Sequence, residues 1–278
     1  MDSSSEKKLN IGKIDYINAS PVYYGLDRGL VPDWIEMTEG PPNILNAMIL
    51  NRQLDISPVS SVFYAMYHKE LLILPDLSIS CHGEVLSVIL MSDFPIDDLD
   101  GKTVVLTRDS ATSSALVRLV SAGKKIYPEF ITKKLRKLED VPDEANAVMV
   151  IGDAAMTQPW EKRFRFRIDL GRLWHEITGM PFVFALWVAR KDCAQERYAQ
   201  VKKALDLFYR SRWEGYSNID EVIASGAERL GLDSSYVRRY FELLHCNLDH
   251  FKIKALDSFF LSLYENGLLP EKVDLSFF

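Results

Sequence analysis

The sequence predicts an α/β fold with largely parallel sheets, and three observations support this. From residue 9 to residue 152, short apolar runs alternate with longer periodic segments, which is the pattern of strands followed by helices. The run 182–189 is apolar without a break, as expected for a strand buried on both faces in the middle of a sheet. After residue 190 the pattern becomes mostly helical.

The strands follow from short apolar runs between turn residues. In chain order we expect strands at 11–17, 54–57, 71–74, 77–81, 85–91, 103–107, 147–151 and 182–189.

The helices follow from cap residues and from apolar spacing. Ser20 is expected to cap a first helix, with Pro21 at its first position. A second helix opens at Pro41-Pro42 and places Ile44, Leu45, Met48 and Ile49 on one face. Further helices are expected at 58–67, 112–122, from Asp153, and at 170–178, 194–213, 219–230, 235–244 and 254–266. We expect the aromatic residues of the last helices to pack in the core and not to form a cofactor site: Trp213, Tyr216, Tyr236, Tyr240, Phe259 and Phe260.

Composition and charge exclude several classes of protein. The 278 residues carry 33 Lys and Arg against 39 Asp and Glu, and the net charge of −6 argues against a nucleic-acid-binding protein. The most apolar stretch, 180–189, is half the roughly 20 residues of a membrane-spanning helix. The first ten residues are expected to form a disordered tail, and they lack the apolar core of a signal peptide. We therefore expect a cytoplasmic protein.

The cysteines and histidines do not form a recognisable metal-binding pattern. Cys81, Cys193 and Cys246 lie far apart in the chain and are odd in number, which predicts reduced, partly buried thiols. The five histidines form no HExxH motif and no cluster with cysteine. We expect no metal site.

The sequence feature most relevant to function is a junction that recurs where a predicted strand meets a helix. It occurs at Asn18-Ala-Ser20, at Ser57-Pro-Val-Ser60-Ser61, at Ser110-Ala-Thr112-Ser113 and at Gly152-Asp153. Ligands of open α/β sheets bind beyond the carboxyl ends of the strands, where helix N-termini offer N–H groups and a positive dipole end. Each junction alone is also an ordinary helix cap. Together they favour a cleft for a small anion, and a carboxylate fits the hydroxyls better than a triphosphate does.

Two other patterns leave the kind of site open. His82 and Glu84 follow a strand and are either an acid/base pair or an exposed turn. The chain has no GxxxxGK[ST], GxSxG or strand-following GxGxxG motif, so a P-loop, a nucleophile elbow and a dinucleotide site are not supported.

Five motifs in register resemble the menaquinone-biosynthesis family of the futalosine pathway. They are IGKIDYINASPVYYGL (11–26), LDISPVSS (54–61), LDGKTV (99–104) followed by SATS (110–113), IGDAA (151–155) and TGMPFVFA (178–185). Their order and spacing extend from about residue 9 to residue 269.

The resemblance implies a two-lobe fold of the periplasmic-binding-protein type II class, with mixed sheets, flanking helices and two crossing hinge strands. The hinge strands would be 85–92 and 183–190. Lobe one would comprise residues 1–92 plus 190–278 and lobe two residues 93–189, with the ligand cleft between the lobes.

The member of the family that this chain resembles most converts chorismate, a dicarboxylate, to 3-[(1-carboxyvinyl)oxy]benzoate by loss of water. No metal or organic cofactor, nucleic acid or membrane is implied, and the protein would be a monomer or a homodimer. A sister lyase of the same fold opens a cyclic futalosine derivative with a His base near Gly152 and Asp153, where this chain has no His. The remaining alternative is a non-catalytic module that binds small anions.

The resemblance also implies roles for individual residues. Ser110, Thr112 and Ser113 would hold one carboxylate, and Ser57, Ser60 and Ser61 would hold the other end of the ligand. Asn18 would orient the leaving hydroxyl or the reacting proton. The base would be Asp153, or a substrate carboxylate would take the proton while Asp153 only caps its helix. The expected ligand contacts also include Ser20, Gly83, Ala111, Pro181 and Phe182.

Overall fold

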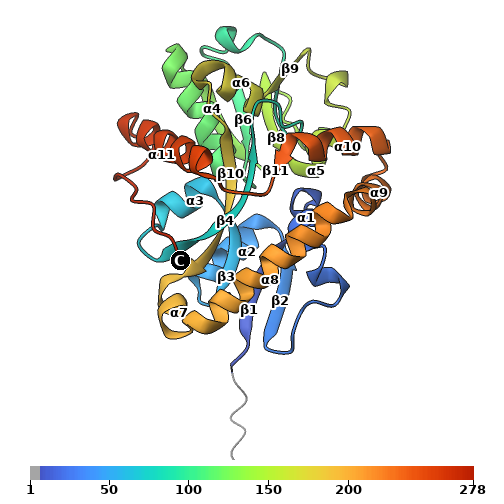
Figure 1. Ribbon diagram of the computed structural model, residues 1–278. Helices are drawn as coiled ribbons and strands as arrows, with labels where there is room; N and C mark the ends of the chain where they lie inside the picture. The colour runs from blue at the N-terminus through green and yellow to red at the C-terminus, as the bar shows by residue number, and fades with distance from the viewer. Residues whose placement is uncertain (1–6) are drawn as a thin grey trace, which may run out of the picture.

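The chain forms two α/β halves, one above the other, around two separate sheets (Figure 1). The computed structural model describes residues 7–278, so most of the tail expected at residues 1–10 lies outside the described part of the chain, while residues 9 and 10 belong to the first strand. The first sheet, in the lower half, has the order β11-β4-β10-β3-β1-β2. Its strands are β1 (Leu9–Ile14), β2 (Ile35–Gly40), β3 (Ile56–Ser60), β4 (Leu71–Cys81), β10 (Phe182–Arg190) and β11 (Leu244–His245). The second sheet, in the upper half, has the order β7-β6-β8-β5-β9. Its strands are β5 (Val88–Ser92), β6 (Thr103–Thr107), β7 (Glu129–Lys133), β8 (Ala147–Ile151) and β9 (Phe166–Asp169).

Both sheets are mixed. In the first, β1 pairs in parallel with β2 and β3, whereas β10 is antiparallel to β3 and β4. In the second, β6 pairs in parallel with β7 and β8, whereas β5 is antiparallel to β8 and β9. The chain leaves the first sheet after Cys81, builds the second sheet from Val88 to Asp169, and returns at Phe182. The division into lobes at 92/93 and 189/190 stays a prediction.

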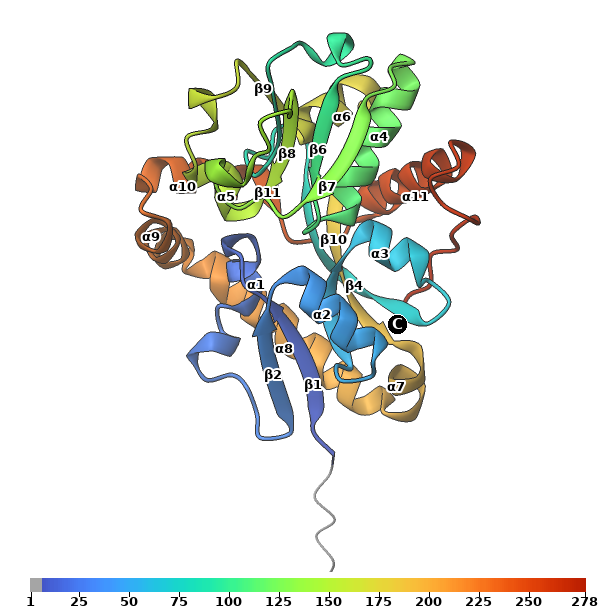
Figure 2. The same cartoon turned by 180° about the vertical axis from the view of Figure 1, so that it is seen from behind.

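Helices flank both sheets. They are α1 (Ser20–Tyr23), α2 (Pro42–Leu50), α3 (Ser61–Met66), α4 (Ala111–Lys124), α5 (Gly152–Thr157), α6 (Leu170–Thr178), α7 (Lys191–Glu196), α8 (Tyr198–Ser217), α9 (Ile219–Leu230), α10 (Ser234–Leu243) and α11 (His250–Glu265), with the short 3-10 helix η1 (Ile17–Ala19) after β1. In both views α10 and α11 lie on opposite sides of the molecule, near the level where the halves meet (Figure 2). Within residues 7–278, no helix combines the length and apolar character needed to cross a bilayer.

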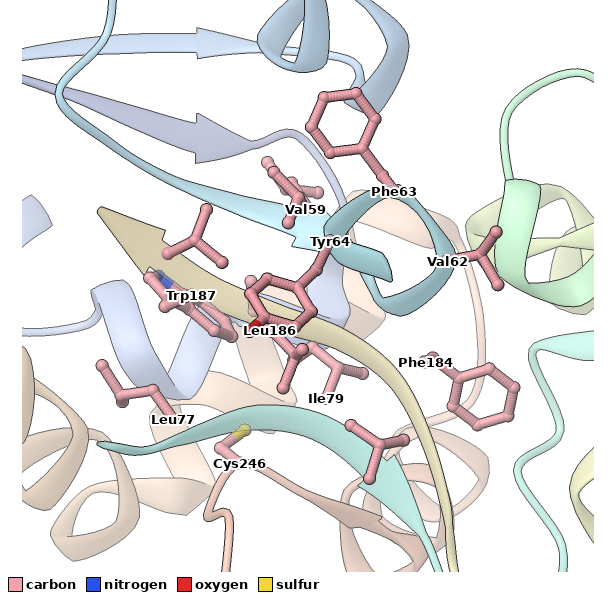
Figure 3. Close-up of a cluster of buried hydrophobic side chains, with 14 of the residues drawn as sticks. Val59, Val62, Phe63, Tyr64, Leu77, Ile79, Phe184, Leu186, Trp187 and Cys246 are labelled. Carbon is pink, nitrogen blue, oxygen red and sulfur yellow. The ribbon is translucent and has the colours of Figure 1, made fainter. Parts of the chain in front are cut away.

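The core of the lower half lies around β10, as its apolar sequence predicts. Val59, Ile79, Leu186 and Trp187, from β3, β4 and β10, are at most 3% exposed and lie around Tyr64 of α3 (Figure 3). β10 is hydrogen-bonded to strands on both sides, so its position in the middle of the sheet is confirmed. All three cysteines are free and buried, which confirms the expected reduced thiols.

Several predicted boundaries were wrong. Ala19, not Ser20, is the N-cap of α1. The strand expected at 54–57 runs to Ser60, because pairing with β10 extends through Pro58 to Ser60, and α3 starts only at Ser61. The strands expected at 71–74 and 77–81 form the single strand β4. β5 begins at Val88 instead of residue 85, since Leu86 has a left-handed φ of 63° that extended strands do not contain.

Two side-chain expectations also failed. Ile44 is 49% exposed, because α2 buries the stripe of Pro42, Leu45 and Ile49. Of the aromatic residues expected in the core of the last helices, Tyr240, Phe259 and Phe260 are buried, whereas Trp213 and Tyr216 are 69% and 42% exposed. The long helix α8 packs on α1 through its Ser211 and Gly215 side, where a Cβ at Gly215 would come 2.2 Å from the carbonyl oxygen of Pro21. Trp213 and Tyr216 are therefore outside the core.

Candidate active site

A cavity lies between the two halves where four strands end. Ile14 and Ser60 close β1 and β3 of the first sheet, while Asp109 and Ile151 lie at the ends of β6 and β8 of the second. The empty space is about 580 Å³, part of it open to solvent. Its lining comprises Ile14, Tyr16, Asn18, Pro42, Ser60, Ile79, Val85, Ser87, Val88, Asp109, Ser110, Ser113, Ile151, Gly152, Phe184, Ala185 and Leu244. We call it the hydroxyl cavity.

Four residues singled out from the sequence line this cavity: Asn18, Ser60, Ser110 and Ser113. The Oδ1 atom of Asn18 and the Oγ atom of Ser60 are buried and have no hydrogen-bond partner among residues 7–278. Buried polar atoms are nearly always paired with protein, water or a ligand. Two unpaired oxygen atoms in one cavity therefore indicate a binding site.

Ser110 and Ser113 form the N-terminus of α4 at the cavity wall. Ser110 caps the helix, since its Oγ atom accepts a hydrogen bond from the backbone N–H of Ser113 at 3.1 Å. The same Oγ atom donates to the Oγ atom of Ser113 at 2.9 Å. A helix of 14 residues with its N-terminus at the cavity presents N–H groups and a positive dipole end to an anion.

Three other predicted residues use their hydroxyls inside the protein. Ser57 donates to the carbonyl oxygen of Pro58 at 3.1 Å, and Ser61 donates to that of Val183 at 2.6 Å. The Oγ1 atom of Thr112 accepts a hydrogen bond from the backbone N–H of Val62 at 2.8 Å. Because Thr112 lies on α4 and Val62 on α3, this bond joins the two halves beside the cavity.

The remaining predicted contacts lie outside the lining of the hydroxyl cavity. Ser20 lines a separate hollow beside Arg229. Gly83 lies in the crossing segment with a φ of 98°. Ala111 is an exposed residue in the first turn of α4. The carbonyl oxygen of Pro181 accepts a hydrogen bond from the indole N–H of Trp174 at 3.1 Å, and Phe182 is buried among aromatic rings. Their ligand contacts stay predictions.

Asp153 lies in a second cavity that adjoins the first. This ion-pair cavity is lined by Asp15, Tyr16, Pro41, Asp109, Leu135, Arg136, Ile151, Asp153, Ala154, Thr157 and Arg229. The carboxylate of Asp153 accepts a hydrogen bond from the backbone N–H of Ile17 at 3.5 Å and lies 3.5 Å from Arg229. Burial raises the pKa of Asp153 above its usual range, and Arg229 opposes that shift.

Tyr16 and Asp109 line both cavities. They are the only ionisable side chains, among the described residues, that line the hydroxyl cavity. Burial, with a smaller contribution from Asp109, raises the pKa of Tyr16 to about 12, so its phenol stays neutral near pH 7. Asp109 lies 3.9 Å from Arg136 in the ion-pair cavity.

Sequence reasoning missed Tyr16, Asp109 and Ser87. Tyr16 and Asp109 stand within two residues of the predicted Asn18 and Ser110, so extending each junction by two residues would have found them. Ser87 carried no such signal, because residues 85–91 were expected to form one strand.

His82 and Glu84 lie away from the hydroxyl cavity. Glu84 forms ion pairs with Arg172 and Arg239 at 2.8 and 2.5 Å, and His82 packs edge-on against His175 with a centroid distance of 4.6 Å. Among residues 7–278, no three or more His, Cys, Asp or Glu side chains gather as they would around a metal ion.

The solved structures similar to this chain share its fold. A protein from Archaeoglobus fulgidus, AF1704, superposes with a TM-score of 0.75 at 19% identity, over 94% of this chain and 98% of that one. The periplasmic aliphatic sulphonate binding protein SsuA from Escherichia coli superposes with a TM-score of 0.60 at 16% identity, over 98% and 91% of the two chains. The fold is therefore of the periplasmic-binding-protein type.

Sequence comparison identifies the family. A chorismate dehydratase from Thermus thermophilus is 29% identical over 245 residues, which are 83% of this chain and 86% of that protein. A chorismate dehydratase from Campylobacter jejuni is 30% identical over 200 residues, 69% of this chain and 71% of that protein. The family model described as menaquinone biosynthesis matches residues 9–265. The chain thus belongs to the menaquinone-biosynthesis family.

Proposed function

We propose that this chain is a hydro-lyase that converts chorismate to 3-[(1-carboxyvinyl)oxy]benzoate in menaquinone biosynthesis. Family membership and the two chorismate dehydratase relatives support this activity. The structural observation that carries it is the hydroxyl cavity, whose unpaired Asn18 and Ser60 oxygen atoms adjoin the N-terminus of α4. The hydroxyl of Ser60 can donate to a carboxylate, and the Oδ1 atom of Asn18 can accept a hydrogen bond from the hydroxyl of the substrate.

One substrate carboxylate is proposed to bind at the N-terminus of α4 to the hydroxyl of Ser113, which Ser110 holds in place by donating to its oxygen atom. Charge-assisted hydrogen bonds from hydroxyl and N–H groups bind a carboxylate without a cation in the cavity wall. Ser60 would bind the other end of the ligand. Asn18 would contact the reacting part of the ring, where its amide can donate to the departing hydroxyl.

The reaction removes a proton from the ring carbon that bears the enolpyruvyl ether and hydroxide from the neighbouring carbon. The electron pair of the broken C–H bond forms the new ring double bond, and the departing hydroxide combines with the released proton to form water. Aromatisation of the ring provides the driving force. The protein must hold the substrate in the reactive conformation and exclude bulk water.

We infer that a substrate carboxylate, and not Asp153, accepts the proton. Asp153 lines the ion-pair cavity, and its carboxylate already contacts Ile17 and Arg229. Of the two ionisable groups in the hydroxyl cavity, Tyr16 is neutral near pH 7 and Asp109 faces Arg136. A substrate carboxylate held next to the reacting carbon needs no base from the protein.

We also propose a cytoplasmic location, which the three free, buried cysteines support because free thiols persist in reducing compartments. The protein would act as a monomer or a homodimer, which light scattering of the purified chain distinguishes.

Incubation of the purified protein with chorismate tests the proposed activity. We expect a product that is lighter by one water, absorbs as an aromatic ring and retains the carboxyvinyl group in its mass spectrum. Tight chorismate binding in calorimetry without turnover would instead indicate a binding module. Turnover of a cyclic futalosine derivative, and not of chorismate, would indicate the sister lyase.

A further inference from the structure

Ser87 is a cavity residue whose backbone is fixed from several directions. It lies in the segment that crosses from the first sheet to the second, directly before β5. The backbone N–H of Gly152 donates to the carbonyl oxygen of Ser87 at 2.7 Å, and the N–H of Ser87 donates to that of Val85 at 2.8 Å. The carboxylate of Asp169 accepts hydrogen bonds from the N–H groups of Val85 and Leu86, at 2.8 to 3.2 Å. The orientation of its side chain is the main freedom left to Ser87.

The hydroxyl of Ser87 contacts one other side chain, Tyr240 of α10. The two oxygen atoms are 3.2 Å apart, and Tyr240 is 1% exposed. Among residues 7–278, the Oγ atom of Ser87 is the only hydrogen-bond partner of the Tyr240 hydroxyl. The two residues are 153 positions apart in the chain, so α10 brings this hydroxyl to the cavity wall from a distant part of the sequence.

The direction of this hydrogen bond follows from which of the two hydroxyl protons has a second acceptor within reach. If Ser87 donated to Tyr240, the Tyr240 proton would be buried with no acceptor, which is costly. If Tyr240 donates to Ser87, both protons are satisfied, because Ser87 lines the cavity and its own proton can reach a ligand. Burial also raises the pKa of Tyr240 well above its usual value, so the phenol keeps its proton near pH 7.

We propose that Tyr240 is a positioning residue for the dehydration: its hydroxyl donates to the Oγ atom of Ser87 and so directs the Ser87 proton into the cavity, toward an oxygen atom of the bound substrate. This inference rests on the proposed function. Tyr240 does not touch the substrate. It fixes the direction in which Ser87 donates, which is an orientation effect on the reaction.

The test compares four proteins: wild type, Tyr240→Phe, Ser87→Ala and the double variant. Tyr240→Phe keeps the ring and its packing and removes only the hydroxyl. We expect kcat for chorismate to fall about ten-fold, with KM changed less than three-fold, because ground-state binding survives while orientation is lost. In the Ser87→Ala background, Tyr240→Phe should change kcat less than two-fold, since the two hydroxyls act as one unit.

Tyr23→Phe is the matched control. Tyr23 is also 1% exposed, and its hydroxyl is hydrogen-bonded to Trp187 and Gly12, away from the hydroxyl cavity. This variant should lose thermal stability to a similar extent while its kcat stays within two-fold of wild type.

The outcomes separate the inference from the proposed function. An unchanged or higher kcat for Tyr240→Phe, in a wild type that dehydrates chorismate, overturns the inference alone, as does an equal effect of Tyr240→Phe with and without Ser87. A wild type that does not dehydrate chorismate overturns both.

Discussion

The hydroxyl cavity and the ion-pair cavity adjoin and share Tyr16, Asp109 and Ile151, but their polar groups are used differently. In the ion-pair cavity, Arg229 contacts the carboxylates of Asp15 and Asp153 at 2.6 and 3.5 Å, so both carboxylates have a charged partner within the protein. In the hydroxyl cavity, the oxygen atoms of Asn18 and Ser60 are buried without partners.

The two cavities therefore have different roles: the polar groups of one join the two halves of the protein, and those of the other are available to a ligand. Asp153 belongs to α5 of the upper half, whereas Ile17 follows β1 of the lower half, so their hydrogen bond joins the two halves at the cavity. Thr112 joins them in the same way through Val62. Groups whose donors and acceptors are paired within the protein hold the two halves together. Groups with a free donor or acceptor, which are Asn18, Ser60 and the hydroxyl of Ser113, are available to a ligand. Four predictions, in order of decreasing effect on turnover, test this distinction.

Asn18→Ala should have the largest effect. Removing a positioned hydrogen-bonding group from the reacting centre typically lowers kcat by about 100- to 1000-fold, and we expect a loss of that size. Product formation from chorismate measures it, with the melting temperature as a check on folding. A variant that loses affinity but keeps its kcat would show that Asn18 only binds the substrate.

Ser113→Ala should weaken binding more than it slows the reaction. A lost hydrogen bond to a charged group typically costs about 1.5–3 kcal/mol, so we expect KM for chorismate to rise at least ten-fold. Ser114→Ala is the control, because its hydroxyl donates to the carbonyl oxygen of Thr107 and is not part of the cavity lining. Equal KM values in the two variants would argue against a carboxylate site at this helix end.

Asp153→Asn should change kcat by less than about three-fold, since the amide oxygen can still accept the N–H of Ile17 and the lost contact with half-exposed Arg229 contributes little. A base that is essential for proton removal would instead show a loss of about 100-fold or more. Such a loss in a correctly folded protein would show that Asp153, and not a substrate carboxylate, accepts the proton.

Tyr16→Phe should leave turnover near pH 7 almost unchanged and alter stability only in alkali. The pKa of Tyr16 is about 12 in the folded protein, against an ordinary value of 10.0, so folding favours its neutral form. Between pH 10 and 12 the unfolded chain releases a proton that the folded one keeps. The free energy of unfolding therefore falls as pH rises, by on the order of 1 kcal/mol per pH unit from this residue.

Urea unfolding of wild type and Tyr16→Phe at several pH values above 9 measures this effect. Identical slopes of stability against pH in the two proteins would contradict the buried, neutral phenol.

The parts of the site that the sequence predicted are those decided locally. The cap at Ser110, the strand 147–151 and the junctions after β1, β3, β6 and β8 depend on neighbouring residues, and the structure has them at the cavity. Which hydroxyls face the cavity could not be predicted, because Thr112 and Ser61 have partners on other elements. Ser87 escaped prediction for the same reason: its position depends on the left-handed Leu86 and on contacts with Asp169 and Tyr240.

The most direct test is a crystal structure of the wild-type protein with 3-[(1-carboxyvinyl)oxy]benzoate. We predict that the product occupies the hydroxyl cavity, with one carboxylate on the hydroxyl of Ser113 and the ring beside Asn18. A product bound in the ion-pair cavity, with its carboxylates on Arg136 and Arg229, would contradict the distinction between the two cavities.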